Sequence, residues 1–342
     1  MGQDHPPALP RRRLLGAAVL AAGAVVGRRV SAQTAQSAQP TPPRWPTNAI
    51  RILLVYPPGG VSDGILRLLA DQLSGLLAVP VQVVYRPGAS GSLGLEALAG
   101  AAPDGQTLAF TALSPMTLYP QLAKVRYDPL RDIQAVASVM LTPSLLVATP
   151  AFAGASVADL SAAACAAPGR LRWATTGAGT TGHLVLAQWQ RASGCAVTHI
   201  PYKGGGQQLN DALAGHFELL STNMAAAQLQ HIRSGQFKPL AVGAPQRLPS
   251  LPEVPTWTEL GLAAANLASV FCLVAPAGTP APLVRQLNEA VNLALASPPL
   301  VEALRKAENL ATGGSADQLA ALIRQEHAQH RQLLQATAIK LD

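Results

Sequence analysis

The stretch "VYPPGGVSDGILRLLADQL", residues 55–73, passes from an apolar run through a Pro-Pro-Gly-Gly turn into a leucine-rich segment. The run before the turn, residues 50–56, is short and almost entirely apolar, as expected of a parallel strand buried on both faces. After the turn, isoleucine and leucine recur at helical spacing, which predicts a helix from about residue 63 to residue 77. A strand, a glycine turn and a helix in this order indicate an α/β fold.

The same alternation continues along the chain. Apolar runs at residues 79–85 and 106–112 predict two more strands, and the segment between them predicts a loop and a helix. An apolar run at residues 144–150 leads into a second series of strands and helices, and the run at residues 270–276 leads back. We therefore expect an α/β fold of two lobes, each a mainly parallel sheet flanked by helices, with a ligand cleft between them.

The first 32 residues are typical of an export signal peptide. The stretch "PRRRLLGAAVLAAGAVVGRRVSAQ", residues 10–33, combines a basic start, a short apolar run and small residues around Ala32. The apolar run is too short for an ordinary membrane-spanning helix, and paired arginines followed by two leucines resemble a twin-arginine signal. Cleavage after Ala32 would release the protein into the periplasm; an uncleaved N-terminal anchor is the alternative.

The remaining boundaries follow from composition and from the strand pattern. Residues 33–47 are rich in Gln, Pro and Thr, which is typical of a flexible linker. The first lobe is expected over residues 48–147 and the second over residues 148–269. Residues 270–342 are expected to return to the first lobe and to cover it with helices.

Charge and cysteine content exclude several classes of protein. Loss of the first 32 residues would remove five Arg and one Asp, leaving 20 basic against 17 acidic residues and a net charge of +3. No basic cluster remains of the kind that nucleic-acid binding requires. Cys165 and Cys195 flank one predicted α/β unit and are candidates for a disulfide, whereas Cys272 lies in an apolar run and is expected to be buried. No His or Cys residues have zinc-type spacing, so neither a metal nor another cofactor is predicted.

The loops after the strands carry the candidate ligand contacts, because ligands of open α/β sheets lie at the carboxyl ends of the strands. In the loop of residues 56–63, Gly59 and Gly60 let the backbone approach a ligand, and the helix N-terminus that follows favours an anion. The loop lacks the lysine of a phosphate-binding P-loop and the glycine pattern of a dinucleotide site. Asp63 is expected either to cap the helix or to contact the ligand.

A second loop, "TTGAGTTGHL" at residues 175–184, places four threonines and three glycines ahead of a helix. Hydroxyl and backbone N–H groups at a helix N-terminus form an uncharged site suited to a carboxylate, although an ordinary capped loop is the alternative. The loops at residues 111–116, 201–211 and 221–223 add further hydroxyl groups and glycines. The chain has no GxSxG or HExxH motif and no carboxylate pair that stands out for acid–base chemistry. This combination is typical of a binding protein rather than an enzyme.

Five stretches of the chain carry a specific resemblance to a known family. They are "YPPGGVSDGILRLLADQL", "VVYRPGASGSLGLEALAGAAPDGQTL", "YDPLRD", "HIPYKGGGQQLNDALAGHFEL" and "VFCLVAPAGTPAPLVRQLN". In this order they resemble the Bug family, the periplasmic solute-binding proteins of tripartite tricarboxylate transporters. The resemblance implies a type II periplasmic-binding-protein fold that closes on a small carboxylate through backbone N–H groups, hydroxyl groups and ordered water. The chain departs from the usual family pattern at Tyr56, Gly182 and Ser221.

The loops and the resemblance together predict the ligand contacts and the partners. The residues expected to contact the ligand are Tyr56, Pro58, Gly59, Gly60, Asp63, Thr111, Ser114, Thr176, Gly179, Thr180, Thr181, His183, Tyr202, Lys203, Gly204 and Asn223. The expected partners are a small carboxylate and the membrane components of a tripartite tricarboxylate transporter, or else a sensor kinase. An exported enzyme acting on a carboxylate is a further alternative. A monomer is expected, and no nucleic-acid partner.

Overall fold

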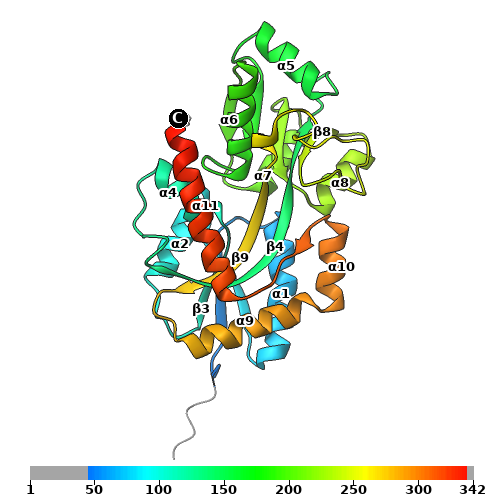
Figure 1. Cartoon of the computed structure of the whole chain (residues 1–342). Coiled ribbons are helices and arrows are strands. Elements are labelled where there is room, and N and C mark those ends of the chain that lie inside the picture. The colour runs from blue at the N-terminus through cyan, green and yellow to red at the C-terminus, as the bar shows by residue number, and fades with distance from the viewer. Residues whose placement is uncertain (1–44, 337–342) are drawn as a thin grey trace, which may run out of the picture. The chain divides into compact units, whose positions relative to one another are not determined.

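The computed structural model describes residues 45–336 as one body built around a long, curled sheet (Figure 1). Its first elements are β1 (Ile50–Leu54), α1 (Val61–Leu77), β2 (Val81–Tyr85), α2 (Ser92–Ala99), β3 (Thr107–Ala112), α3 (Ser114–Thr117), α4 (Tyr119–Leu122) and β4 (Ile133–Ala148). The middle of the chain forms α5 (Val157–Ala166), β5 (Arg172–Thr175), α6 (Thr181–Ser193), β6 (Thr198–Pro201), α7 (Gly205–Leu213), β7 (Leu219–Asn223), α8 (Ala226–Arg233) and β8 (Lys238–Gly243). The last elements are β9 (Ala268–Pro276), α9 (Ala281–Leu295), α10 (Pro298–Lys306), β10 (Leu310–Ala311) and α11 (Ala316–Ala336).

Two long strands, β4 and β9, connect the two lobes. The strand order is β2-β1-β3-β9-β4-β7-β5-β6, with β8 and β10 also paired to β4. Residues 133–143 of β4 pair antiparallel with β9 in the first lobe, and residues 144–148 pair with β7 and β8 in the second. Within the lobes, β1 pairs in parallel with β2 and β3, and β5 pairs in parallel with β6 and β7. The sheet of each lobe is therefore mixed: its outer strands are parallel, antiparallel pairing with β9 or β4 joins them to the centre, and β4 belongs to both lobes.

The first half of β4 is the main difference from the expected secondary structure. The apolar run predicts a strand only from residue 144, yet β4 begins at Ile133. Residues 133–142 mix alanine, serine, glutamine and threonine with larger apolar side chains, so they have weak strand propensity. Pairing with β9, and not local sequence, therefore makes this segment a strand. Because β4 contributes to both lobes, the lobe boundaries given above remain proposals.

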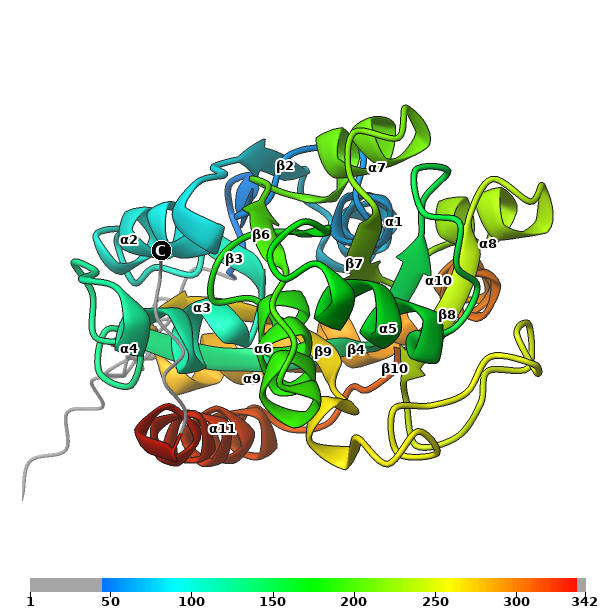
Figure 2. The same ribbon diagram turned by 90° about the horizontal axis from the view of Figure 1, so that it is seen from above.

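The strand β1 shows why the continuous apolar runs form buried strands. Its alternate side chains enter two different cores: Ile50 and Ile52 pack against one face of the sheet, and Leu53 against the other. Helices α1, α9 and α10 cover the first face, and α2 and α11 cover the second. Seen from above, α1 and α11 lie on opposite sides of the central strands (Figure 2). The second lobe has the same layered form, with buried tryptophans in one of its two cores.

The described residues begin near the end of the predicted linker. The predicted export signal at residues 1–32 and most of the linker lie outside the described residues. Trp45, inside the predicted linker, is attached to the first lobe, because its indole Nε1 donates to the Asp104 carbonyl oxygen at 3.0 Å. The Trp45 carbonyl in turn accepts a hydrogen bond from Gln286 at 3.1 Å. The attached part of the chain thus includes Trp45, three residues before the start of the expected first lobe.

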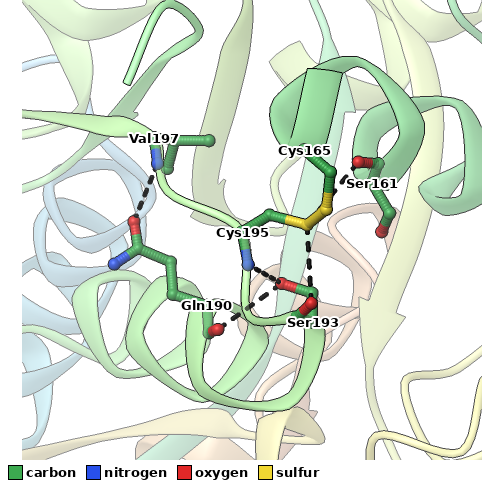
Figure 3. The surroundings of a disulfide bond; sticks show 6 residues. All are labelled: Ser161, Cys165, Gln190, Ser193, Cys195 and Val197. Carbon is green, nitrogen blue, oxygen red and sulfur yellow. Dashed lines mark hydrogen bonds between the residues drawn. A yellow bond between two sulfur atoms is a disulfide. The ribbon is translucent and has the colours of Figure 1, made fainter. Parts of the chain in front are cut away.

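A disulfide joins Cys165 of α5 to Cys195, just after α6 (Figure 3). The two Cα atoms are 4.9 Å apart, and 30 residues separate the cysteines in sequence. Closing a loop of about this length stabilises a fold by roughly 3–4 kcal/mol if the effect is treated as lost chain entropy of the unfolded state. Cys272 is buried in β9, as expected, and burial raises the pKa of its thiol. The pairing suits an oxidising compartment.

Candidate ligand-binding site

A cavity of about 320 Å³ lies between the lobes, where the loops after β1, β3, β5, β6 and β7 meet. A cavity of this size is at the lower end of the range for small-molecule sites. Nine of the sixteen predicted contact residues line it: Tyr56, Gly59, Gly60, Ser114, Thr176, Thr180, Thr181, Gly204 and Asn223. The loops that follow these strands therefore meet around one cavity.

No charged side chain occurs among the described residues that line the cavity. The first turns of α1, α6, α7 and α8 all contribute to its wall. Each helix N-terminus presents unpaired backbone N–H groups and a partial positive charge. Several such ends around one uncharged cavity form an environment suited to an anion.

The inner end of the cavity carries a short chain of polar groups. The Ser269 hydroxyl lies 2.9 Å from Thr181 Oγ1 and 2.9 Å from Asn223 Oδ1. Because a serine hydroxyl has one proton, Ser269 can donate to the Asn223 oxygen while it accepts from Thr181. In that arrangement the Asn223 amide nitrogen is a donor group at the cavity wall. Side chains from α6, β7 and β9 are thus held together at one point.

Internal hydrogen bonds hold the loop of residues 175–183 in shape. Thr180 Oγ1 donates to the Gly177 carbonyl at 2.7 Å, so the proton of this hydroxyl is used within the loop. His183 Nδ1 accepts from the Gly179 N–H at 3.0 Å, and its ring stacks on His199 with centroids 4.3 Å apart. His199 is also 2.7 Å from Thr175 Oγ1. The histidines therefore support the loop from behind the cavity wall.

A charged group holds the loop of residues 56–63 on the opposite side. The Asp63 carboxylate accepts from the Gly59 N–H at 2.9 Å, from Arg67 Nε at 2.9 Å and from the Tyr85 hydroxyl at 2.7 Å. Burial raises the pKa of Asp63, but these three hydrogen bonds outweigh it and hold the pKa below its ordinary value. Asp63 is therefore engaged in fixing the start of α1, and its side chain does not line the cavity.

Tyr56 lies at the junction between the loop and the cavity floor. Its hydroxyl oxygen accepts a hydrogen bond from the Ala112 N–H at 3.3 Å, and its ring meets Phe271 edge to face at 6.0 Å. Burial raises the pKa of Tyr56 to about 12, so the phenol is neutral at physiological pH. The phenol is thus an uncharged polar group on the cavity wall.

Seven predicted residues lie off the cavity wall, and most have other partners. The Thr111 hydroxyl donates to the Ala112 carbonyl, and the Tyr202 hydroxyl donates to Asp211 at 2.7 Å. Lys203 is exposed. The other four are Pro58, Asp63, Gly179 and His183. Contact of any of the sixteen residues with a ligand stays a prediction.

The two lobes touch through glycine backbone. A Cβ atom at Gly204 would lie 2.5 Å from Pro57 Cδ, and one at Gly206 would lie 2.9 Å from the Pro58 carbonyl oxygen. Ser90 of the first lobe also donates to the Ala178 carbonyl at 2.5 Å. The tight glycine turns therefore bring the loop after β1 against the start of α7.

Sequence reasoning missed several residues of the cavity wall. Ser62, Gln228, Ser269 and Phe271 line the cavity, and the Gln228 Oε1 atom is buried without a hydrogen-bond partner. Further apolar lining residues are Ile65, Leu68, Leu209, Ala303 and Ala307. Ser269 is the second residue of the antiparallel strand β9, so the amino end of this strand faces the cleft. Phe271 lies on the same strand, and most of the other residues lie on helices α1, α7, α8 and α10, so the loops that follow the strands do not include them.

Two departures from the family pattern are neighbours in space. Gly182 lines the cavity at the start of α6, and a Cβ atom there would lie 3.0 Å from Ser221 Oγ. The Ser221 hydroxyl is buried and has no hydrogen-bond partner in the described structure. The absence of a side chain at position 182 thus allows α6 to begin close to β7.

A second cavity of about 120 Å³ lies behind the inner end of the first and shares Ser114, Thr181 and Ser269 with it. Glu326 and His330 of α11 line this second cavity. Burial raises the pKa of Glu326 to about 7 and lowers the pKa of His330 to about 4. At neutral pH Glu326 is therefore partly protonated and His330 is neutral.

Residues 45–336 contain neither a candidate metal cluster nor a candidate membrane-spanning helix. The described part of the chain brings no three His, Cys, Asp or Glu residues together in a group that could hold a metal ion. None of its helices combines the length and the apolar character needed to cross a membrane.

Comparison with known proteins identifies the family. Residues 65–339 match the family described as "Tripartite tricarboxylate transporter family receptor" (TctC). The chain belongs to this family. Its relatives include Protein BugT of Bordetella pertussis, which is 36% identical over 261 residues, covering 76% of this chain and 80% of BugT. The resemblance to the Bug family is thereby confirmed, and the family consists of periplasmic receptors rather than enzymes.

Solved structures of similar proteins share the two-lobed fold. The structure described as "R. palustris Rpa4515 with adipate" is 30% identical and has a TM-score of 0.81, covering 86% of this chain and 99% of that one. MatC from Rhodopseudomonas palustris "with bound malate" is 26% identical and has a TM-score of 0.78, covering 83% and 98% of the two chains. The expected two-lobed periplasmic-binding-protein fold is confirmed.

Proposed function

We propose that this receptor binds a small carboxylate in the interlobe cavity and delivers it to the membrane components of a tripartite tricarboxylate transporter. The observation that carries the proposal is the cavity itself: helix N-termini and neutral polar side chains surround it, and no charged side chain lines it. The adipate and malate named with its structural relatives are both dicarboxylates. Cleavage and export of the N-terminal segment belong to the same proposal.

Thr181, Ser269 and Asn223 are the groups that we assign to the carboxylate. Their side chains come from α6, β9 and β7 and are joined by hydrogen bonds of 2.9 Å. A carboxylate oxygen at this point can accept from the Asn223 amide and from the backbone N–H groups of the first turn of α6. Tyr56 and the turn at Gly59 and Gly60 face the same cavity from the first lobe.

Binding can be tested on the purified protein with a panel of carboxylic acids that includes adipate and malate. We expect at least one acid to raise the melting temperature and to give saturable heat of binding, with no consumption of the acid. Mass spectrometry of a ligand that copurifies with the protein would identify its natural class. A folded protein that binds no carboxylic acid would contradict the proposal. Delivery requires a second test, because loss of the gene should reduce uptake of the same acid by the cell.

A further inference from the structure

We propose that the carboxylic acid bound here carries an uncharged and mainly apolar body, which lies between α1 and α10 of the first lobe and α7 and α8 of the second. This inference rests on the proposed function and adds the class of substrate. It arises from the uneven distribution of polar groups along the cavity.

The two ends of the cavity differ in chemistry. The inner end, which borders the second cavity, contains Ser114, Thr181 and Ser269. The end near the surface is marked by the exposed residues Gly64 and Ala226. The polar end is therefore deep and the other end opens to solvent, so a carboxylate held inside would direct the rest of the molecule outward.

The outer walls are apolar because three helices turn apolar faces toward the cavity. Ile65 and Leu68 are one turn apart on α1, and Ala303 of α10 is one turn from Ala307, the residue that follows this helix. Leu209 of α7 faces them from the second lobe. A methylene or aromatic group between these walls would lose contact with water and gain contact with apolar carbon. The two alanines leave room that larger side chains would fill.

The outer walls offer no cationic partner to a second carboxylate, because no charged side chain lines the cavity. Gln228 lies in the first turn of α8, and its Oε1 atom is buried without a partner, so this oxygen does not reach the open part of the cavity. A second carboxylate between the apolar side chains of α1, α7 and α10 would lose much of its hydration.

A series of straight-chain acids distinguishes the contribution of the carboxylate to affinity from the contribution of the apolar chain. We would measure the affinity of the purified protein for propanoate, butanoate, hexanoate and adipate by calorimetry. Each methylene that the outer walls bury should strengthen binding by about fourfold. Hexanoate should therefore bind at least tenfold more tightly than propanoate and at least tenfold more tightly than adipate, which has the same carbon chain and a second carboxylate.

The outcomes distinguish this inference from the function on which it rests. If adipate or propanoate binds as tightly as hexanoate, the inference that the ligand has an apolar body is overturned. The proposal that the protein binds a carboxylate would still stand. Failure of all four acids and of the wider carboxylate panel would overturn both. An affinity that rises from propanoate through butanoate to hexanoate, with weaker binding of adipate, would support both proposals.

A matched pair of variants locates the apolar body. Leu68→Asn keeps the approximate size of the side chain but makes this wall polar, and it should weaken hexanoate about five- to tenfold while propanoate changes by less than twofold. Leu293→Asn is the control, because Leu293 is 63% exposed on α9 and does not line the cavity. Equal weakening of hexanoate and propanoate by Leu68→Asn, or no weakening of either, would overturn the assignment of this wall.

Discussion

The loops of residues 56–63 and 175–183 face one cavity from opposite lobes, but they are supported in different ways. The first depends on a carboxylate, because Asp63 binds Gly59, Arg67 and Tyr85. The second depends on neutral groups, the stacked rings of His183 and His199 and the hydroxyls of two threonines. In the sequence both appear as a glycine turn at the start of a helix.

The difference indicates a division of labour between the lobes. Asp63 keeps its charge outside the cavity wall, so the first loop offers backbone groups and little negative potential to an incoming anion. The second loop holds Thr181 beside Ser269 and Asn223, so it offers polar side chains. A ligand would thus be recognised chemically by the second lobe and enclosed by the first.

Replacing Thr181 with valine should weaken carboxylate binding most. The change keeps the shape of the side chain but removes the hydroxyl that donates to Ser269, so Ser269 and the Asn223 amide that it orients are no longer held in place for the carboxylate. Loss of such a buried hydrogen-bond partner costs about 1–3 kcal/mol. The expected loss is roughly 5- to 150-fold in affinity, measured by calorimetry with the acid identified above. The melting temperature without ligand should change little.

Thr258→Val is the matched control, because Thr258 is exposed on the second lobe and does not line the cavity. Wild-type affinity in the Thr181→Val variant would show that the second lobe does not recognise the carboxylate through this side chain. That result would contradict the proposed roles of the two lobes.

The stacked histidines should make the second loop sensitive to acid. Burial and the neighbouring His183 lower the pKa of His199 from 6.5 to about 4. The unfolded chain therefore binds more protons between these values, so the stability that neutral His199 contributes is complete above pH 6.5 and is lost as the pH falls through 4. Denaturation by urea at pH 7.5 and pH 4.5 should show that the wild type loses about 1–3 kcal/mol more than His199→Gln.

The variant comparison removes the effect of other groups. Glu326, whose pKa is raised to about 7, contributes with the opposite sign, because its buried neutral form stabilises the fold at low pH and this contribution is lost as the pH rises toward 7. Glu326 is present in both proteins and cancels in their difference. Equal loss of stability in the wild type and in His199→Gln would exclude His199 as the acid-sensitive group of the second loop.

The first loop should respond less to loss of its charged group. Asp63→Ala removes the acceptor of three hydrogen bonds, but Arg67 is 59% exposed and its ion pair is worth little in water. We expect a loss of about 0.5–1.5 kcal/mol in the free energy of unfolding at neutral pH. Because the pKa of Asp63 is lowered, the difference from wild type should disappear only as the pH falls below 3.8.

Asp71→Ala, at an exposed position of the same helix, is the control for this variant. Asp63→Ala could lose more free energy of unfolding than the difference between wild type and His199→Gln at low pH. That result would mean that the charged support of the first loop is stronger than the histidine support of the second.

The sequence predicts those parts of the molecule that local rules determine. Apolar runs such as residues 50–54 are strands because both faces of a central parallel strand are buried. Glycine turns and threonines at helix starts lie around the cavity because parallel strands end at the same edge of the sheet. These rules need no knowledge of distant contacts.

The rest depends on contacts between segments that are far apart in sequence. The first half of β4 is a strand because β9 pairs with it, more than 120 residues later. Ser269 reaches the cavity because β9 runs antiparallel and brings its amino end there. Leu68 and Ala307 form one wall only after α1 and α10 pack together. The apolar half of the site was therefore not predictable from loops and motifs.

The contact between the glycine turns has a practical consequence. Because the lobes meet through the main chain at Pro58 and Gly206, the width of the closed cleft is set by backbone atoms. A single methyl group at residue 206 would act as a wedge and hold the lobes apart while every binding side chain stays native. Such a protein would be a receptor that is correctly folded and chemically complete but cannot enclose its cargo, and it would show how much of transport depends on closure alone.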